Sequence, residues 1–222
     1  MNKIFTFAGL RLACGPLAYK NGKFVISKDW KQNSFGKASG KTEGSTYFNW
    51  NEVRDINLDG WCLPTTKEWE AILGTNRKGA IYNGKKNSCF AYIEVDGIHD
   101  GLLLFPDNAI INGIQIIGIN QQGIATELQD EDPTNVGEQQ LKELLEQGCV
   151  FIPAIGFRDT VIGLNDGDVR QEGGWSEFDH LGIYWLNDEE DEDNAWTFYF
   201  DLLEGNFDYS DKINCYPIRL IK

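Results

Sequence analysis

The carboxyl-terminal third of the chain gathers aromatic, carboxylate and amide side chains that could bind a ligand. We single out eight of them as candidate ligand-binding residues: Trp175, Trp185, Asn187, Asp188, Asp191, Asp193, Asn194 and Tyr209. Aromatic faces stack on sugar rings or fill pockets in a partner protein, while carboxylates and amides hydrogen-bond to hydroxyl groups. These residue types predict recognition of a glycan or a protein, without catalysis.

Six consecutive acids, from Asp188 to Asp193, raise the question of a bound cation. Calcium binds several oxygen ligands, which carboxylates in this run could supply. A run of consecutive acids nevertheless lacks the alternating spacing that turns ligands toward one centre. We therefore expect no metal or other cofactor and favour a solvated loop, with calcium as the alternative.

Other chemistries find little support in the residue types. The five cysteines are widely spaced and form no Cys-X-X-Cys pair, which disfavours zinc and predicts mostly small buried thiols: Cys14, Cys62, Cys89, Cys149 and Cys215. The two histidines, His99 and His180, lie in unrelated segments, and no Gly-X-Ser-X-Gly sequence occurs. A paired-carboxylate glycosidase site needs more assumptions than a solvated acidic run. We expect no catalytic residue and no enzyme.

Charge is distributed unevenly along the chain, whose formal net charge is -14. Residues 171–211 hold thirteen acids and no Lys or Arg, whereas the first fifty residues hold eight Lys or Arg and two acids. Because the aromatic-rich end is the acidic one, nucleic acid is not the expected partner. No apolar run approaches the length of a membrane span, so we expect no membrane insertion. Arg11 interrupts the one segment similar to a lipoprotein signal, which implies action without export or a leader already removed.

Two helix starts are predicted early in the chain by capping boxes, in which a side chain and a backbone amide three residues apart bond reciprocally. The first pairs Asn49 with Glu52, and the second pairs Thr65 with Glu68. In the second helix Trp69, Ile72 and Leu73 share one face, and Gly74 is expected to end it in a left-handed cap.

The remaining segments favour strands, with one further helix. Strands are expected at residues 4–14, 23–27, 89–96, 101–105, 150–154, 182–186, 195–202 and 213–221, with an Ile-rich run at 110–119 and a hairpin turn at Asn21-Gly22. A helix is expected at 138–147, ended by Gly148, after a solvated insertion at 120–137. Arg158 and Arg219 follow apolar runs and are expected to pair with buried acids. We interpret residues 1–222 as one domain.

The stretch Gly60-Trp61-Cys62-Leu63-Pro64-Thr65-Thr66-Lys67-Glu68-Trp69 resembles a signature of C-type-lectin-like folds. It is similar to segments in bacterial surface proteins of the Bacteroidetes type, in the Fibrobacter major paralogous domain family and in the formylglycine-generating enzymes. Further similar segments, in the same order along the chain, lie at residues 15–19, 150–158, 182–185, 194–196 and 216–220. The resemblance implies an α+β fold with antiparallel sheets, two early short helices and a long carboxyl-terminal loop region that carries the ligand surface.

The resemblance leaves three functions open. The first is a lectin-like or adhesin module on a cell surface, outside the cell or on a phage particle. The second is a retroelement-diversified variable protein, and the third is a thiol oxidase of the formylglycine-generating type. That enzyme uses two cysteines near the carboxyl end, where this chain has only Cys215, so the oxidase is the least favoured. The oligomeric state is left open.

Overall fold

The structure is a computed structural model that describes residues 4–28, 30, 40–74, 76–97, 99–112, 134–155, 157–158, 175–176, 181–201 and 205–222. Three helices occur within these residues: α1 (Trp50–Val53), α2 (Thr66–Leu73) and α3 (Glu138–Glu146). The described strands form two-, three- and four-stranded sheets. The α+β class is therefore confirmed, with a third helix beyond the two early ones.

Both capping boxes form as predicted. The side chain of Asn49 accepts a hydrogen bond from the Glu52 amide at 3.1 Å, and Glu52 accepts one from the Asn49 amide at 3.2 Å. Thr65 and Glu68 bond in the same reciprocal way at the start of α2. The predicted left-handed cap at Gly74 is wrong, because this residue has extended backbone with a φ of -61°.

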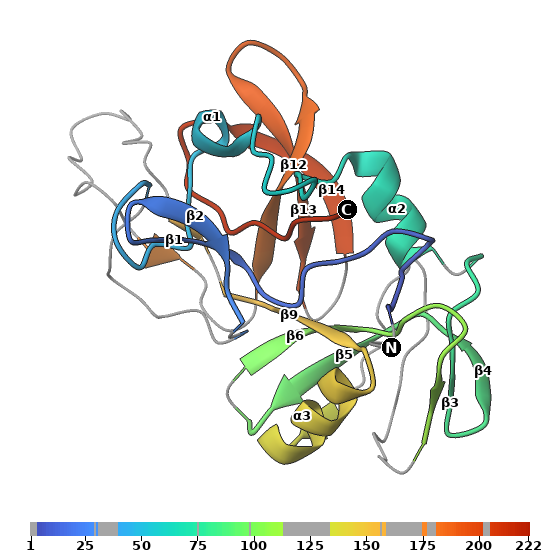
Figure 1. Cartoon of the computed structure of the whole chain (residues 1–222). Helices are drawn as coiled ribbons and strands as arrows, with labels where there is room; N and C mark the ends of the chain where they lie inside the picture. Colours follow the sequence, from blue (N-terminus) through green and yellow to red (C-terminus); the bar gives the residue numbers. More distant parts are fainter. Residues whose placement is uncertain are drawn as a thin grey trace.

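One antiparallel sheet packs against α2 (Figure 1). Its order is β12 (Gly182–Glu189), β13 (Asn194–Phe200) and β14 (Gly205–Asp211). The indole of Trp69 meets the ring of Phe198 edge-on at 5.4 Å, so the apolar face of α2 is buried as expected. A strand was predicted at 213–221, but only isolated bridges occur there, and the third strand of the sheet is β14.

A second sheet forms the other half of the molecule, with α3 packed against it (Figure 1). Its order is β8 (Thr134–Val136), β5 (Phe90–Val95), β6 (His99–Leu104) and β9 (Val150–Pro153). The small sheet beside it has the order β4 (Lys85–Ser88), β3 (Ala80–Tyr82) and β7 (Ile110–Ile111). Two pairs are parallel, β5 with β8 and β3 with β7, so the sheets are not antiparallel throughout. Val136 is buried, which corrects the prediction that the insertion is solvated through residue 137; residues 113–133 lie outside the described part.

The amino-terminal hairpin joins β1 (Leu17–Lys20) to β2 (Lys23–Ile26) through the predicted turn, where Asn21 and Gly22 have φ of 51° and 75°. Residues 4–14 were predicted as a strand but make only isolated bridges. Their backbone pairs with the carboxyl end, since Arg11 and Lys222 exchange two hydrogen bonds at 2.8 and 2.9 Å. The remaining pair is β10 (Phe157–Arg158) with β11 (Trp175–Ser176).

Two buried arginines behave differently. Arg77 pairs with Asp107 at 2.8 Å and also donates to the carbonyl oxygens of Ile72, Cys89 and Phe105, tying the end of α2 to the second sheet. Arg219 is 1% exposed and donates to the Phe151 carbonyl at 3.1 Å, while its Nε and Nη1 have no hydrogen-bond partner among the described residues. No acid pairs with Arg219 among the described residues, so the expected pairing stays a prediction; the side chain of Arg158 lies outside the described part.

All five cysteines are free thiols. Cys89, Cys149 and Cys215 are buried, as predicted for most of them, whereas Cys14 and Cys62 are exposed. Burial raises the pKa of the Cys89 and Cys149 thiols. Partial burial of its sulfur, together with the nearby Glu68 carboxylate, also raises the pKa of Cys62. This exposed side chain is therefore kept as the less reactive thiol rather than the thiolate.

Candidate functional site

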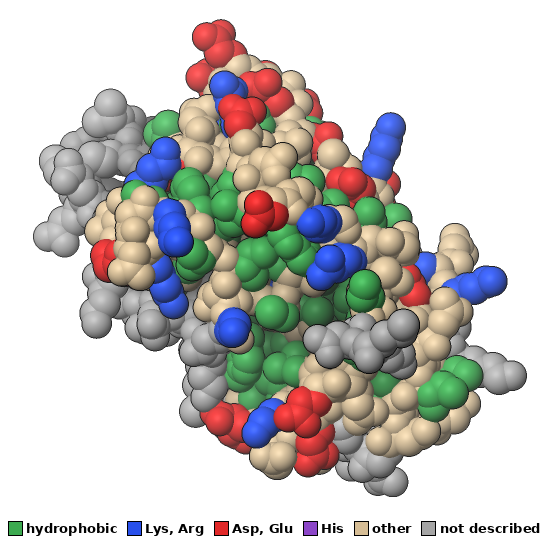
Figure 2. Space-filling model, in the orientation of Figure 1, with side chains coloured by type: hydrophobic (Ala, Val, Ile, Leu, Met, Phe, Trp, Pro, Cys, Tyr) green, Lys and Arg blue, Asp and Glu red, His purple; other side chains and the backbone are tan. Residues whose placement is uncertain are grey.

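The acidic run forms the tip of the β12–β13 hairpin, which projects from one end of the molecule (Figure 1). Asn187 and Asp193 are exposed there, whereas Asn194 is half-buried. Figure 2 shows acidic side chains gathered at this end. Asp188 and Glu189, predicted to lie in a loop, instead belong to β12. The structure thus presents a negatively charged projection built on two paired strands.

One end of this hairpin is anchored by Asp188. Its carboxylate accepts a hydrogen bond from the backbone amide of Thr66, the first residue of α2. A carboxylate is favourable there because the first amides of a helix lack partners within it and carry partial positive charge. The Asn187 amide also donates to the Pro64 carbonyl at 2.8 Å. Asp188 therefore positions the hairpin on α2, and its carboxylate is already engaged.

Asp191 organises the turn at the hairpin tip. Its Oδ1 accepts from the amides of Asp193 and Asn194 at 2.8 and 2.7 Å, and the Asn194 side chain donates to both of its oxygens at 3.1 Å. These hydrogen bonds, the one from the Asn194 side chain first, lower the pKa of the Asp191 carboxyl. The turn is thus closed by one carboxylate and the amides that follow it.

Lys212 supplies a cation inside the acidic hairpin. Its ammonium donates to the Glu192 carbonyl at 2.7 Å and to the Asp191 carbonyl, and it pairs with the Glu189 carboxylate. The same ammonium lies 5.0 Å from the centre of the Trp50 ring. Lys212 is only 4% exposed, so its charge offsets the repulsion among the acids from within the fold.

Of the two predicted tryptophans, Trp185 does not join this surface. Trp185 is 0% exposed, and its indole N–H donates to the Phe48 carbonyl at 2.9 Å, so we assign it to the core and correct its place in the site. Trp175 pairs with Arg158 in a separate two-stranded sheet, and its side chain lies outside the described part.

Tyr209 lies beside the hairpin and forms an aromatic surface with Trp196. Tyr209 is 54% exposed and lies directly across from Trp196 in the β13–β14 register, with the rings edge-to-face at 6.2 Å. Because side chains alternate along strands, Asn194 and Asp211 share the same sheet face. Neither Trp196 nor Asp211 was among the predicted ligand-binding residues; Trp196 packs partly against the core and is half-buried, whereas Asp211 is exposed.

No group of three or more His, Cys, Asp or Glu side chains that could hold a metal ion occurs in the described part of the chain. Three acids of the hairpin already have partners: Asp188 accepts from the start of α2, Asp191 accepts from the turn amides, and Glu189 pairs with Lys212. Residues 4–155 and 181–222, apart from their undescribed gaps, include no helix long and apolar enough to cross a membrane.

Comparisons with known proteins gave one match. A family model described as Domain of unknown function (DUF8237) matches residues 23–99, which run from the start of β2 to the start of β6. The match covers less than half of the chain and does not include the β12–β14 sheet. No curated protein and no solved structure matches the chain.

Proposed function

We propose that the protein is a non-catalytic recognition module that binds a glycan or a protein through the outer end of the β13–β14 sheet face and the adjoining acidic hairpin. The edge-to-face pair of the half-buried Trp196 and the exposed Tyr209, on the same sheet face as Asp211 and Asn194, carries this proposal. An aromatic face next to fixed hydrogen-bonding groups suits a sugar ring or an amphipathic side chain.

We further propose a C-type-lectin-like fold and action at a cell surface, outside the cell or on a phage particle. Supporting features are the two capped early helices, the pairing of the chain's two ends and the late antiparallel sheet beside α2. We assign the ligand surface that the resemblance implies to the carboxyl-terminal third, where the hairpin projects.

Binding screens on a glycan array and on an array of extracellular protein domains, followed by titration of each hit, test the proposed function. We expect Tyr209→Ser to weaken a true ligand about tenfold, equal to about 1.4 kcal/mol of binding free energy. Ile110→Ser is the matched control, because Ile110 is 64% exposed but lies on β7 in another sheet. Hits that bind Tyr209→Ser and Trp196→Ala as tightly as the original protein would contradict the proposed site.

A further inference from the structure

Trp61 separates two hollows on the protein surface. One has a volume of about 380 Å³ and the other about 300 Å³, and Trp61 lines both. The indole is held by a tight turn, in which Leu58 and Trp61 pair across Asp59 and Gly60, whose φ values are 52° and 85°. Together the hollows form a groove, which we call the Trp61 groove, and the indole stands as a ridge within it.

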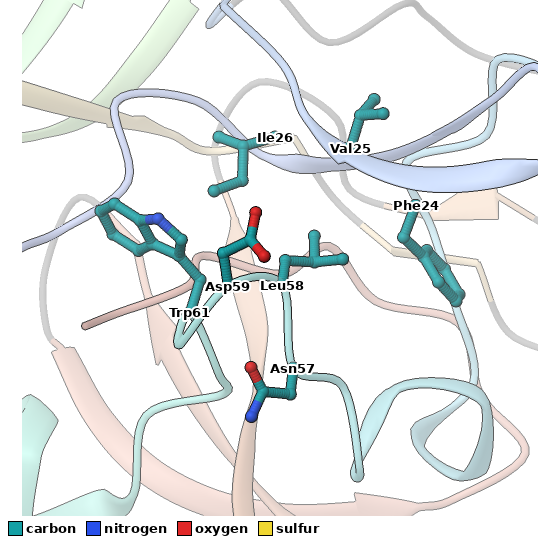
Figure 3. A pocket seen from close by; sticks show the side chains of 7 residues that line it. All are labelled: Phe24, Val25, Ile26, Asn57, Leu58, Asp59 and Trp61. Carbon is teal, nitrogen blue, oxygen red and sulfur yellow. The ribbon is translucent and has the colours of Figure 1, made fainter.

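The larger hollow lies between β2 and this turn (Figure 3). Its walls are the side chains of Phe24, Ile26, Leu58 and Trp61, all half-buried. The carboxylate of Asp59 points toward β2 between Ile26 and Leu58. No hydrogen bond or ion pair engages this carboxylate within the described residues, so it can accept a hydrogen bond from a ligand.

The smaller hollow lies between the amino-terminal segment and the loop from α3 to β9. Apolar side chains supply most of its lining, among them Phe5, Leu12 and Val150. Phe5 lies on Gly148, where a Cβ atom would come within 2.4 Å of the ring, so the hollow depends on a glycine at this helix end. Figure 2 shows hydrophobic side chains gathered in the hollowed middle of this face, with Lys and Arg side chains around them.

Three cations border the groove and lack a carboxylate partner in the described part of the chain. The Arg11 guanidinium lies 5.1 Å from the centre of the Trp61 ring, and the Lys41 ammonium lies 5.8 Å from that of Phe24. The Lys222 ammonium donates to the backbone carbonyl of Asp59, not to its carboxylate. Asp59 is thus one negative charge among three positive ones, in a protein whose net charge is -14. The groove is a local site of positive charge on an acidic molecule.

We propose that the Trp61 groove binds an extended segment of a partner protein that carries two apolar side chains two residues apart, with Asp or Glu on either side. Alternate side chains of an extended segment point the same way and stand about 6.6 Å apart, which lets them enter the hollows on the two sides of one indole. The flanking carboxylates meet Arg11, Lys41 and Lys222, and this charge complementarity selects an acidic segment. The Asp59 carboxylate accepts a backbone N–H from the same segment.

Other classes of partner fit the groove less well. A membrane surface is flat and cannot fill two hollows, and the negative charge of the whole protein repels a nucleic acid, with a phosphate at every nucleotide, far more than a short segment with a few acids. A sugar ring needs several hydrogen-bonding groups, whereas Asp59 is the one polar side chain that Figure 3 shows pointing among the apolar walls. An acidic and apolar protein segment satisfies both the shape and the charge.

Selection from a random peptide library displayed on phage tests the proposal. We expect the selected peptides to share two apolar residues separated by one position and flanked by acids. A synthetic peptide of that pattern should bind in fluorescence anisotropy about tenfold more weakly to Trp61→Ala and to Arg11→Gln than to the original protein. Lys67→Gln is the control, because this exposed cation on α2 lines neither hollow and should leave binding unchanged.

Several outcomes would overturn this proposal without bearing on the β13–β14 surface. Selected peptides that lack acids, or that bind Trp61→Ala and Arg11→Gln unchanged, would remove the groove as the site. Binding to phosphatidylserine vesicles that needs Trp61, with no peptide selected, would reassign the groove to lipid. Arg11→Gln keeps the indole in place, so it remains informative if Trp61→Ala fails to fold.

Discussion

Trp69 combines a buried indole with an N–H group that has no hydrogen-bond partner among the described residues. We expect Trp69→Ala to lower the free energy of unfolding by about 3 to 5 kcal/mol, because it leaves a cavity against Phe198. Trp69→Phe should cost clearly less, since it keeps an aromatic ring and removes the unpaired N–H. Urea denaturation of both variants measures this, and equal losses would show that the unpaired group has no energetic weight.

Arg77 and Arg219 offer a second comparison between buried residues of one type. We expect Arg77→Met to lower the free energy of unfolding by about 3 to 5 kcal/mol, because it leaves the Asp107 carboxylate without its cation. Arg219→Met should cost at most about 1 kcal/mol, because it breaks one hydrogen bond but also removes a buried charge that no described acid pairs with. Thermal and urea unfolding measure both, and a larger loss at Arg219 would reveal a partner outside the described residues.

The hairpin β12–β13 already contains its own cation, and this decides our expectation for calcium. Lys212 occupies the space among the Glu189 side chain and the carbonyls of Asp191 and Glu192. We therefore expect millimolar calcium to leave the melting temperature unchanged and chelator to have no effect, since a ligand stabilises only the state that binds it. A rise in melting temperature with calcium, reversed by chelator and abolished by Asp193→Asn, would show that the tip binds the ion.

Buried tyrosine and cysteine side chains with raised pKa make the stability of the whole molecule depend on pH. Burial raises the pKa of Tyr92, with smaller contributions from Asp100, Asp201 and Glu94, and it also raises the pKa of Tyr184 and Cys149. A group whose folded-state pKa is raised contributes stability below its unfolded pKa and loses it as pH rises. The free energy of unfolding should therefore fall above about pH 8.5, where thiols ionise in the unfolded chain. It should fall more steeply above about pH 10, where phenols ionise there as well.

Denaturation in urea between neutral and strongly alkaline pH measures this decline. Each phenol that ionises only on unfolding adds a slope of about 1.4 kcal/mol per pH unit, so Tyr92→Phe should flatten the alkaline limb by that amount. A part of the phenolate absorbance that rises near pH 10 in the folded protein and is removed by Tyr92→Phe would contradict the burial of Tyr92.

Charge also differs between faces of the molecule. The sequence has an acidic carboxyl-terminal third and a basic amino-terminal region, and the two chain ends pair through their backbones. Within the hairpin Lys212 nevertheless pairs with one acid, Glu189, and the cations beside Trp61 remain without carboxylate partners among the described residues. The molecule therefore presents an acidic projection and a separate basic groove, each available to a different partner.

Local signals in the sequence determined the helices, the first turn and several strands. A capping box joins residues three apart, and the Asn21-Gly22 turn needs only the φ preferences of its own residues, so neither depends on distant contacts. The strand Val150–Pro153 is also predicted by its own residues, because a continuous apolar run indicates a buried strand. Asn187 and Asp193 were also correctly expected to be exposed, since polar side chains stay hydrated.

Only the tertiary structure decided which of these residues face a ligand. Strand β14 is mostly polar and looks like a loop, yet it forms because β13 pairs with its backbone. Trp185 is a core residue because the Phe48 carbonyl accepts its N–H, and Phe48 lies far from it in sequence. Lys212 donates hydrogen bonds to the hairpin from some twenty residues away in the sequence. The Trp61 groove is lined by both the amino-terminal segment and the loop before β9. Such contacts between distant segments follow from the packing of the whole chain, which no local pattern encodes.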